Sequence, residues 1–289
     1  MRMNLSGLCL VILMGAGLCA AQNAPAPATQ QPVYSFVYCS GFVTNQKLSN
    51  EMHLISGEQS GEKMTFTQGD YVYINRGSNK GVKAGDEFSV LRPVQEPMKS
   101  MWFRGQTQLM RAMGTAYEDE GRIKVVRADA KVSIAQVVFS CGYMQRGDTL
   151  LSFQERPAPP YKDPGLFNHF AEPSGKATGT VVNMSDFELL AGRNHTAYVN
   201  LGAAQGVKVG DYLRIFRYQG RTREEVPQYH NLQYEVLGFG STPARYTGKD
   251  LPREVLGEGI VLNVSANSST VLITTATTSI FAGDYAEIE

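Results

Sequence analysis

Short runs of alternating apolar and polar residues make up most of this chain, and glycine-containing turns separate them. The runs EFSVLR (87–92) and YLRIFR (212–217) have the alternation of half-buried strands. The stretches 121–139 and 257–276 each read as two strands joined by a turn. Enrichment in Val, Tyr and Phe predicts a further strand at 33–44, where folded sequence begins. Short strands with frequent turns are typical of antiparallel β-barrels and sandwiches.

The segment 96–114 is different, because its apolar residues recur at the spacing of a helix, although Gly105 weakens a helix there. It is rich in methionine and aromatic residues, which offer adaptable contact area at partner surfaces. The alternative is an ordinary hydrophobic flap over the end of a barrel. The candidate binding residues in this segment are Met101, Trp102, Phe103 and Met110.

One turn-centred pattern occurs twice. Residues 73–92 and 198–217 match without a gap at nine of twenty positions, and a later Gly-Asp closes each copy. The shared residues are mainly turn formers, in which glycine permits positive φ and aspartate bonds backbone amides. As general acids or metal ligands the aspartates would need converging partners, so we interpret them as structural. The turn residues are Gly81, Gly85 and Asp86 in the first copy and Gly206, Gly210 and Asp211 in the second.

These patterns predict an all-β protein with two tandem small antiparallel β-barrel or sandwich domains related by internal duplication. A stretch with four prolines in ten residues separates the domains, because proline is excluded from sheet interiors. We assign residues 1–21 to a signal peptide, 22–32 to an Ala/Pro/Gln-rich tether, 33–155 to the first β domain, 156–178 to a Pro-rich linker and 179–289 to the second β domain.

The N-terminus has the features of a secretory signal peptide: a basic start, an apolar run of about eleven residues and small residues before the expected cleavage after Ala21. That run is shorter than the roughly 18–20 residues that span a bilayer, so we expect no stable membrane span. The protein would then be exported, either to the periplasm or into the medium. Lipidation of Cys19 is a narrower alternative, although Leu18 occupies a position where lipid attachment prefers a small side chain.

Two of the four cysteines, Cys9 and Cys19, belong to the signal region, which leaves Cys39 and Cys141. Exported proteins with two cysteines usually pair them, so we predict a disulfide. A catalytic or redox thiol is less favoured, because neither cysteine lies in a CxxC motif and no histidine is close in sequence.

Basic and acidic residues balance at 27 each, which leaves no long-range field to attract nucleic acid. Since the four histidines are widely spaced and no catalytic or cofactor motif is present, we predict no catalytic residue, metal or cofactor. The acidic run 118–120 reads as a solvated turn, with weak calcium binding as the alternative. Each copy of the repeat is interrupted by a long segment that we call an excursion, at 93–120 in the first copy and 218–256 in the second. In the second excursion the candidate contacts to a polar partner or a glycan edge are Tyr229, Tyr234 and Tyr246, and a tyrosine-rich hairpin is the alternative.

The order strand, RG or LG, xxxGVKxGD, strand and closing GD resembles the C-terminal domain of flagellar assembly protein T. It is also similar to a β module found beside LysM peptidoglycan-binding domains in exported bacterial proteins. The resemblance implies an accessory or scaffolding role in the cell envelope. The chain has no LysM segment and no match to the N-terminal part of the flagellar protein, so glycan binding and a flagellar role do not carry over.

We therefore expect a non-enzymatic cell-envelope accessory or scaffolding protein that binds a protein or peptidoglycan partner through its two variable excursions. The alternative is a cell-wall-modifying enzyme, a glycan hydrolase or a transpeptidase, which would need an acid pair or an activated thiol facing one cleft. The sequence leaves the partner's identity and the oligomeric state open.

Overall fold

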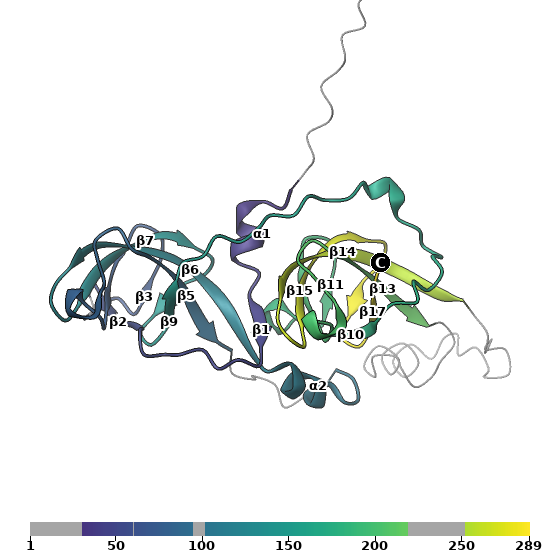
Figure 1. Cartoon of the computed structure of the whole chain (residues 1–289), viewed down its shortest axis with the longest axis horizontal. Coiled ribbons are helices and arrows are strands. Elements are labelled where there is room, and N and C mark those ends of the chain that lie inside the picture. Colours follow the sequence, from purple (N-terminus) through teal and green to yellow (C-terminus); the bar gives the residue numbers. More distant parts are fainter. Residues whose placement is uncertain (1–30, 60, 95–101, 219–251) are drawn as a thin grey trace, which may run out of the picture.

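The computed structural model describes residues 31–59, 61–94, 102–218 and 252–289. Two β-sheet bodies follow one another along the chain, and the Pro-rich linker arches from the first over the second (Figure 1). Four of the predicted features lie outside the described residues: the predicted signal peptide, the tether as far as residue 30, Met101 and the three candidate tyrosines of the second excursion. The prediction of a mainly β chain with barrel architecture is confirmed.

The first body is a curled, seven-stranded antiparallel sheet with the order β2-β4-β7-β6-β5-β9, in which β1 also pairs with β6. A bridge between His53 and Thr149 and a hydrogen bond from Leu54 N to Asp148 O (3.0 Å) bring its two ends together. The strands are β1 (Phe42–Thr44), β2 (Leu54–Gly57), β4 (Tyr71–Ile74), β5 (Glu87–Pro93), β6 (Thr115–Ala128), β7 (Ser133–Ser140) and β9 (Thr149–Ser152), with a separate pair β3 (Thr65–Phe66) and β8 (Met144–Gln145).

The second body is a closed barrel with the order β10-β12-β15-β14-β13-β17. Its interior is filled by aliphatic side chains such as Leu213, Ile215 and Ile273, which are fully buried. The strands are β10 (Thr178–Met184), β12 (Thr196–Val199), β13 (Tyr212–Tyr218), β14 (Arg253–Val264), β15 (Ser269–Ala276) and β17 (Tyr285–Ile288), with a separate pair β11 (Leu190–Ala191) and β16 (Ile280–Phe281). The two bodies thus arrange successive strands in the same order.

The helices of the described chain are short. The strand predicted at 33–44 is wrong in its first half, where residues 34–38 form a helical turn, and right in its second half, which is β1. Gly41, at φ +61°, separates the two parts. The chain turns at this glycine, and this turn overrides the local preference of residues 34–38 for a strand. The helices are α1 (Tyr34–Tyr38), α2 (Gln106–Met113), η1 (Ser78–Lys80), η2 (Pro164–Leu166), η3 (Ser185–Phe187) and η4 (Ala203–Gln205).

The repeated turns have matching geometry in the two bodies. The Asp86 carboxylate accepts a hydrogen bond from Lys83 N at 2.8 Å, and Asp211 accepts one from Lys208 N at the same distance. The four turn glycines Gly81, Gly85, Gly206 and Gly210 all have φ between 87° and 95°, a range that side chains disfavour. Each aspartate thus bonds a backbone amide of its own turn, as expected of a turn-forming residue.

The closing Gly-Asp of each body holds an arginine from the neighbouring strand. Arg92 Nε and Nη2 lie 2.9 Å from the two oxygens of Asp148, and Arg217 makes the same two-point contact with Asp284 at 2.7 Å. Both carboxylates are almost completely buried. Two-point arginine–carboxylate pairs fix orientation as well as charge, so each pair fastens the last strand of its body to the strand after the repeated turn.

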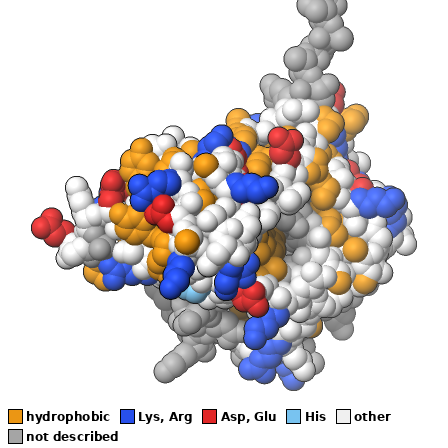
Figure 2. Space-filling model, turned by 60° about the vertical axis from the view of Figure 1, so that its left-hand side comes forward, with side chains coloured by type: hydrophobic (Ala, Val, Ile, Leu, Met, Phe, Trp, Pro, Cys, Tyr) orange, Lys and Arg blue, Asp and Glu red, His pale blue; other side chains and the backbone are white. Residues whose placement is uncertain are grey.

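Figure 2 shows the molecule turned so that the first body comes forward. Basic, acidic and hydrophobic side chains are interspersed over this face. No helix in the described ranges is long and apolar enough to cross a bilayer.

We predict that Asp148→Asn and Asp284→Asn each lower the free energy of unfolding by about 3 kcal/mol, because each removes the charge of a buried carboxylate that holds an arginine at two points. Asp129→Asn is the matched control, since Asp129 and its partner Arg127 are both more than half exposed and such pairs contribute at most about 1 kcal/mol. Urea denaturation followed by circular dichroism measures all three variants. Equal losses for buried and exposed pairs would contradict the assigned role.

Candidate functional site

A segment near the N-terminus, residues 37–44, lies between the two bodies and contacts both; we call it the spine. On the side of the barrel, Tyr198 Oη donates to Ser40 O (3.0 Å) and Ser268 Oγ donates to Val43 O (2.7 Å). Thr270 Oγ1 also donates to the Gly41 carbonyl. The barrel therefore hydrogen-bonds the backbone of the spine through three buried hydroxyl groups.

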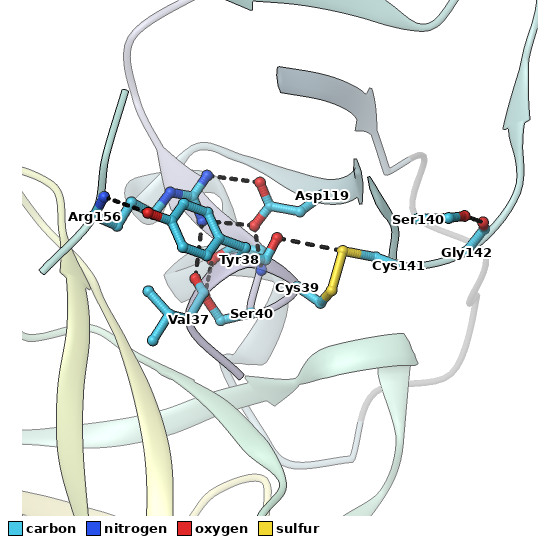
Figure 3. The surroundings of a disulfide bond; sticks show 10 residues. Val37, Tyr38, Cys39, Ser40, Asp119, Ser140, Cys141, Gly142 and Arg156 are labelled. Atoms are coloured by element: carbon cyan, nitrogen blue, oxygen red, sulfur yellow. Dashed lines mark hydrogen bonds and ion pairs between the residues drawn. A yellow bond between two sulfur atoms is a disulfide. The ribbon is translucent and has the colours of Figure 1, made fainter. Parts of the chain in front are cut away.

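On the side of the first sheet, the spine is fixed covalently and by charge (Figure 3). Cys39 and Cys141 form a disulfide, as the sequence predicted. Asp119 accepts a hydrogen bond from Gly41 N (3.0 Å) and pairs with both terminal nitrogens of Arg156 at 2.6 and 2.8 Å. Arg156 Nη1 also donates to Val37 O. One buried carboxylate thus ties the spine, the first sheet and the start of the linker together.

The acidic run 118–120 is not a solvated turn, and that prediction is wrong. These residues lie inside β6, where Asp119 and Glu120 are buried and Glu120 is 2.7 Å from Arg92 Nη1. Three adjacent acids are normally solvated, and their arginine partners lie 26 or more residues away in the sequence, so local pattern could not locate them.

Burial raises the pKa of the Glu120 carboxyl to about 7. Arg92 opposes this shift, while the neighbouring acids Asp148 and Glu118 add to it. Arg92 is shared between Glu120 and Asp148, so the second carboxylate limits how far Arg92 lowers the pKa of Glu120.

Helix α2 crosses from the first sheet onto the barrel. Its first residue, Gln106, is buried and donates from Nε2 to Val182 O (2.9 Å), while its Oε1 accepts from Trp102 N (2.8 Å). The helix ends at Gly114, where φ is +108° and an added Cβ would lie 2.2 Å from Thr44 O. Only glycine fits where the chain passes this close to Thr44. The helix is therefore fixed at its start by the hydrogen bonds of Gln106 and at its end by the close packing of Gly114. The predicted helix is confirmed over 106–113.

The contact between the bodies leaves a cavity of about 140 Å³. Its walls are mainly apolar and come from the spine, α2 and the start of β6 on one side, and from β10, η3 and β12 on the other. The side chains that matter below are Val43, Met110, Met113, Val182, Asn183 and Tyr198. Ligand sites in proteins are concave and mostly apolar, with a few polar groups that orient the ligand.

Asn183 is the unusual member of this set. It is 5% exposed, and its Oδ1 is buried with no hydrogen-bond partner among the described residues. A buried amide oxygen without a partner is uncommon and costs stability. Asn183 was not predicted from the sequence, where the available signal is one polar residue among the otherwise apolar residues of VVNM (181–184).

The structure separates the predicted binding residues. Met110 lines the cavity, whereas Phe103 packs on the barrel, with its Cγ 3.1 Å from the point where a Cβ on Gly283 would lie. Trp102 is half-buried next to the start of α2. The described part of the first excursion therefore joins the two bodies, rather than covering the end of its own sheet; contact between Trp102 and a partner stays a prediction.

No protein-family model matches this chain, and no curated protein matches it significantly. Within the part of the chain that the structure describes, no cluster of three or more His, Cys, Asp or Glu side chains is arranged to hold a metal ion.

We predict that the double substitution Cys39→Ser/Cys141→Ser lowers the free energy of unfolding by about 3–5 kcal/mol. The bridge closes a loop of 102 residues, and the chain-entropy account gives this range for loops of that length. Denaturant unfolding of the variant, with the reduced natural protein as the control, measures the loss. A loss of unfolding free energy below about 1 kcal/mol would contradict the prediction. It would show that Asp119 and the β1–β6 pairing hold the spine without the disulfide.

We predict that Glu120→Gln changes how stability depends on pH. The folded-state pKa of Glu120 is raised from 4.5 to about 7, so its stabilising contribution is present at low pH and is lost as the pH rises through 7. Relative to the natural protein, the variant should gain about 2–3 kcal/mol between pH 5 and pH 8. Urea denaturation at both pH values measures the gain, with Asp129→Asn as the control. Parallel pH profiles would contradict the raised pKa.

Proposed function

We propose that this chain is an exported, non-enzymatic accessory or scaffolding protein of the cell envelope, composed of two duplicated β domains. The duplication is supported by the common strand order, the matched turns and the matched arginine–aspartate pairs. Export is supported by the sequence of the N-terminus and by the disulfide, which suits an oxidising compartment.

The observation that carries a binding role is the contact between the two bodies. We call this contact, in which the spine, α2 and the start of β6 meet β10, η3 and β12, the joint. The excursion from the first domain, which interrupts the repeat, supplies α2 to this joint and lines its cavity. Excursions of this kind, placed on a β framework, are where recognition residues concentrate in proteins. We propose that the partner, an envelope protein or peptidoglycan, contacts the surface around Trp102, at the start of this excursion's described part.

The second candidate function, a cell-wall-modifying enzyme, has less support. Cys39 and Cys141 are bonded to each other, so neither sulfur is a free nucleophile in this state. Asp86, Asp211 and Asp284 bind backbone amides, and Asp284 also holds an arginine. These groups therefore have structural roles that account for their presence.

The partner test uses a photo-crosslinking amino acid, p-benzoylphenylalanine, at Trp102 and, as the control, at Lys131 in the exposed turn between β6 and β7. Irradiation in envelope extracts should give a specific adduct from position 102 and none from position 131. Co-sedimentation with purified peptidoglycan sacculi tests the glycan alternative.

We further predict that Trp102→Ala folds normally and weakens partner recovery roughly thirtyfold, the size expected for an aromatic contact at the centre of an interface. Circular dichroism checks the fold. Unchanged recovery, together with no adduct and no sedimentation with sacculi, would exclude this surface as the contact.

A further inference from the structure

We propose that the cavity between the two bodies binds a free, neutral, single-ring aromatic molecule with one hydroxyl or amine group, and that the Asn183 amide accepts the hydrogen bond from this group. This inference goes beyond the macromolecular partner proposed above and does not depend on it.

Asn183 lines the cavity because of a β-bulge in β10. The pairing of β10 with β12 shifts register between Val181 and Asn183. Consecutive side chains of a regular strand point to opposite faces, but here Val182 and Asn183 both line the cavity. The carbonyl of Val182 is satisfied by Gln106, whereas the Asn183 oxygen accepts nothing from the described residues. The bulge therefore presents one polar group that the fold itself does not use.

Folding alone gives no reason for an amide at this position. An unsatisfied buried polar group costs about 1–3 kcal/mol, and an apolar residue of the same shape would avoid that cost. The corresponding position in the first sheet, set by its pairing with Tyr73, is Ser56, where the surroundings are only half-buried. The side-chain amide that lacks a hydrogen-bond partner, that of Asn183, thus occurs in the body where the contact with the other body buries this position.

The backbone beside the cavity is also strained. Phe187, which lines the cavity, has φ +53°, and Asp186 before it has φ +56°. Left-handed conformations cost residues other than glycine about 1–3 kcal/mol, and they concentrate at ligand sites. The two left-handed residues thus lie where an aromatic residue lines the cavity.

The size and chemistry of the walls define the ligand class. A volume of about 140 Å³ is close to that of engineered apolar cavities of roughly 150 Å³ that bind benzene, so one ring fits. Met110 and Met113 supply flexible, polarisable walls that adapt to a ring. No Asp, Glu, Lys, Arg or His is among the residues that line the cavity in the described chain, so a neutral ligand is favoured.

The test compares phenol with toluene, which has nearly the same shape and no donor, on the natural protein and on Asn183→Leu. Dissociation constants come from titrations followed by the methyl NMR signals of Met110 and Met113, assigned by substituting each with leucine. We expect phenol binding, relative to toluene binding, to weaken about tenfold in Asn183→Leu, the loss of one buried hydrogen bond.

Two further variants serve as controls. Asn79→Leu, which changes an exposed asparagine of η1, should leave both affinities unchanged. Ala116→Leu fills the cavity and should abolish binding of both probes. Asn183→Leu should unfold at the same or a higher temperature than the natural protein, whereas a structural role for the amide would lower it.

Three results would overturn the proposal. The first is the absence of any shift of the Met110 and Met113 signals with either probe at millimolar concentration. The second is the same ratio of phenol to toluene affinity in the natural protein and in Asn183→Leu. The third is tighter binding of N-acetyl-tyrosinamide than of phenol, which would assign the ring to a tyrosine of a protein partner.

Discussion

The buried carboxylate of Asp119 connects three parts of the chain that are distant in sequence. Its oxygens bind the guanidinium of Arg156, where the linker begins, and the backbone N–H of Gly41, in the spine. Burying a carboxylate costs free energy unless its oxygens are paired, so these partners together favour one arrangement of the three parts. The spine in turn presents its carbonyls to the hydroxyl groups of the barrel. The relative placement of the two bodies therefore depends on this carboxylate, because it holds the spine on the first sheet.

The middle of the linker is held by the same kind of interaction. Lys162 Nζ lies 2.6 Å from Glu258 and 2.7 Å from Glu289, and Arg253 pairs with Glu287 while donating to Ala171 O. Burial raises the pKa of Glu258 to about 7, an increase to which Glu289 contributes. Ion pairs of this type add little net stability when both partners are present, but they strongly disfavour other placements. A linker rich in proline, which cannot pair with a sheet, is thereby given a defined path across the barrel.

The sequence was sufficient for features that a few adjacent residues determine. Gly81, Gly85 and Asp86 define a turn by themselves, because positive φ and the carboxylate–amide bond are local, and the disulfide followed from counting cysteines. The joint was not accessible in this way. Gln106 and Asn183 have ordinary neighbours in the sequence, and their importance arises only when α2 reaches the bulge of β10. The helical turn at 34–38 was missed for a related reason, since aromatic residues that favour a strand here pack as a short helix against Phe139 and Phe153.

The two bodies differ where the joint forms, although their strand orders agree. Asp119 occupies the position that Val255 has in the barrel, as shown by their pairing with Leu91 and Phe216. The repeat-matched tyrosines differ as well: Tyr198 is buried under the spine and donates to it, whereas Tyr73 is only half-buried. A common framework keeps both bodies folded, and a small number of changes at corresponding positions creates an asymmetric contact with its own cavity. The proposed binding role is therefore best tested where the two bodies diverge, because the residues they share already form turns, strand pairs and the two arginine–aspartate pairs.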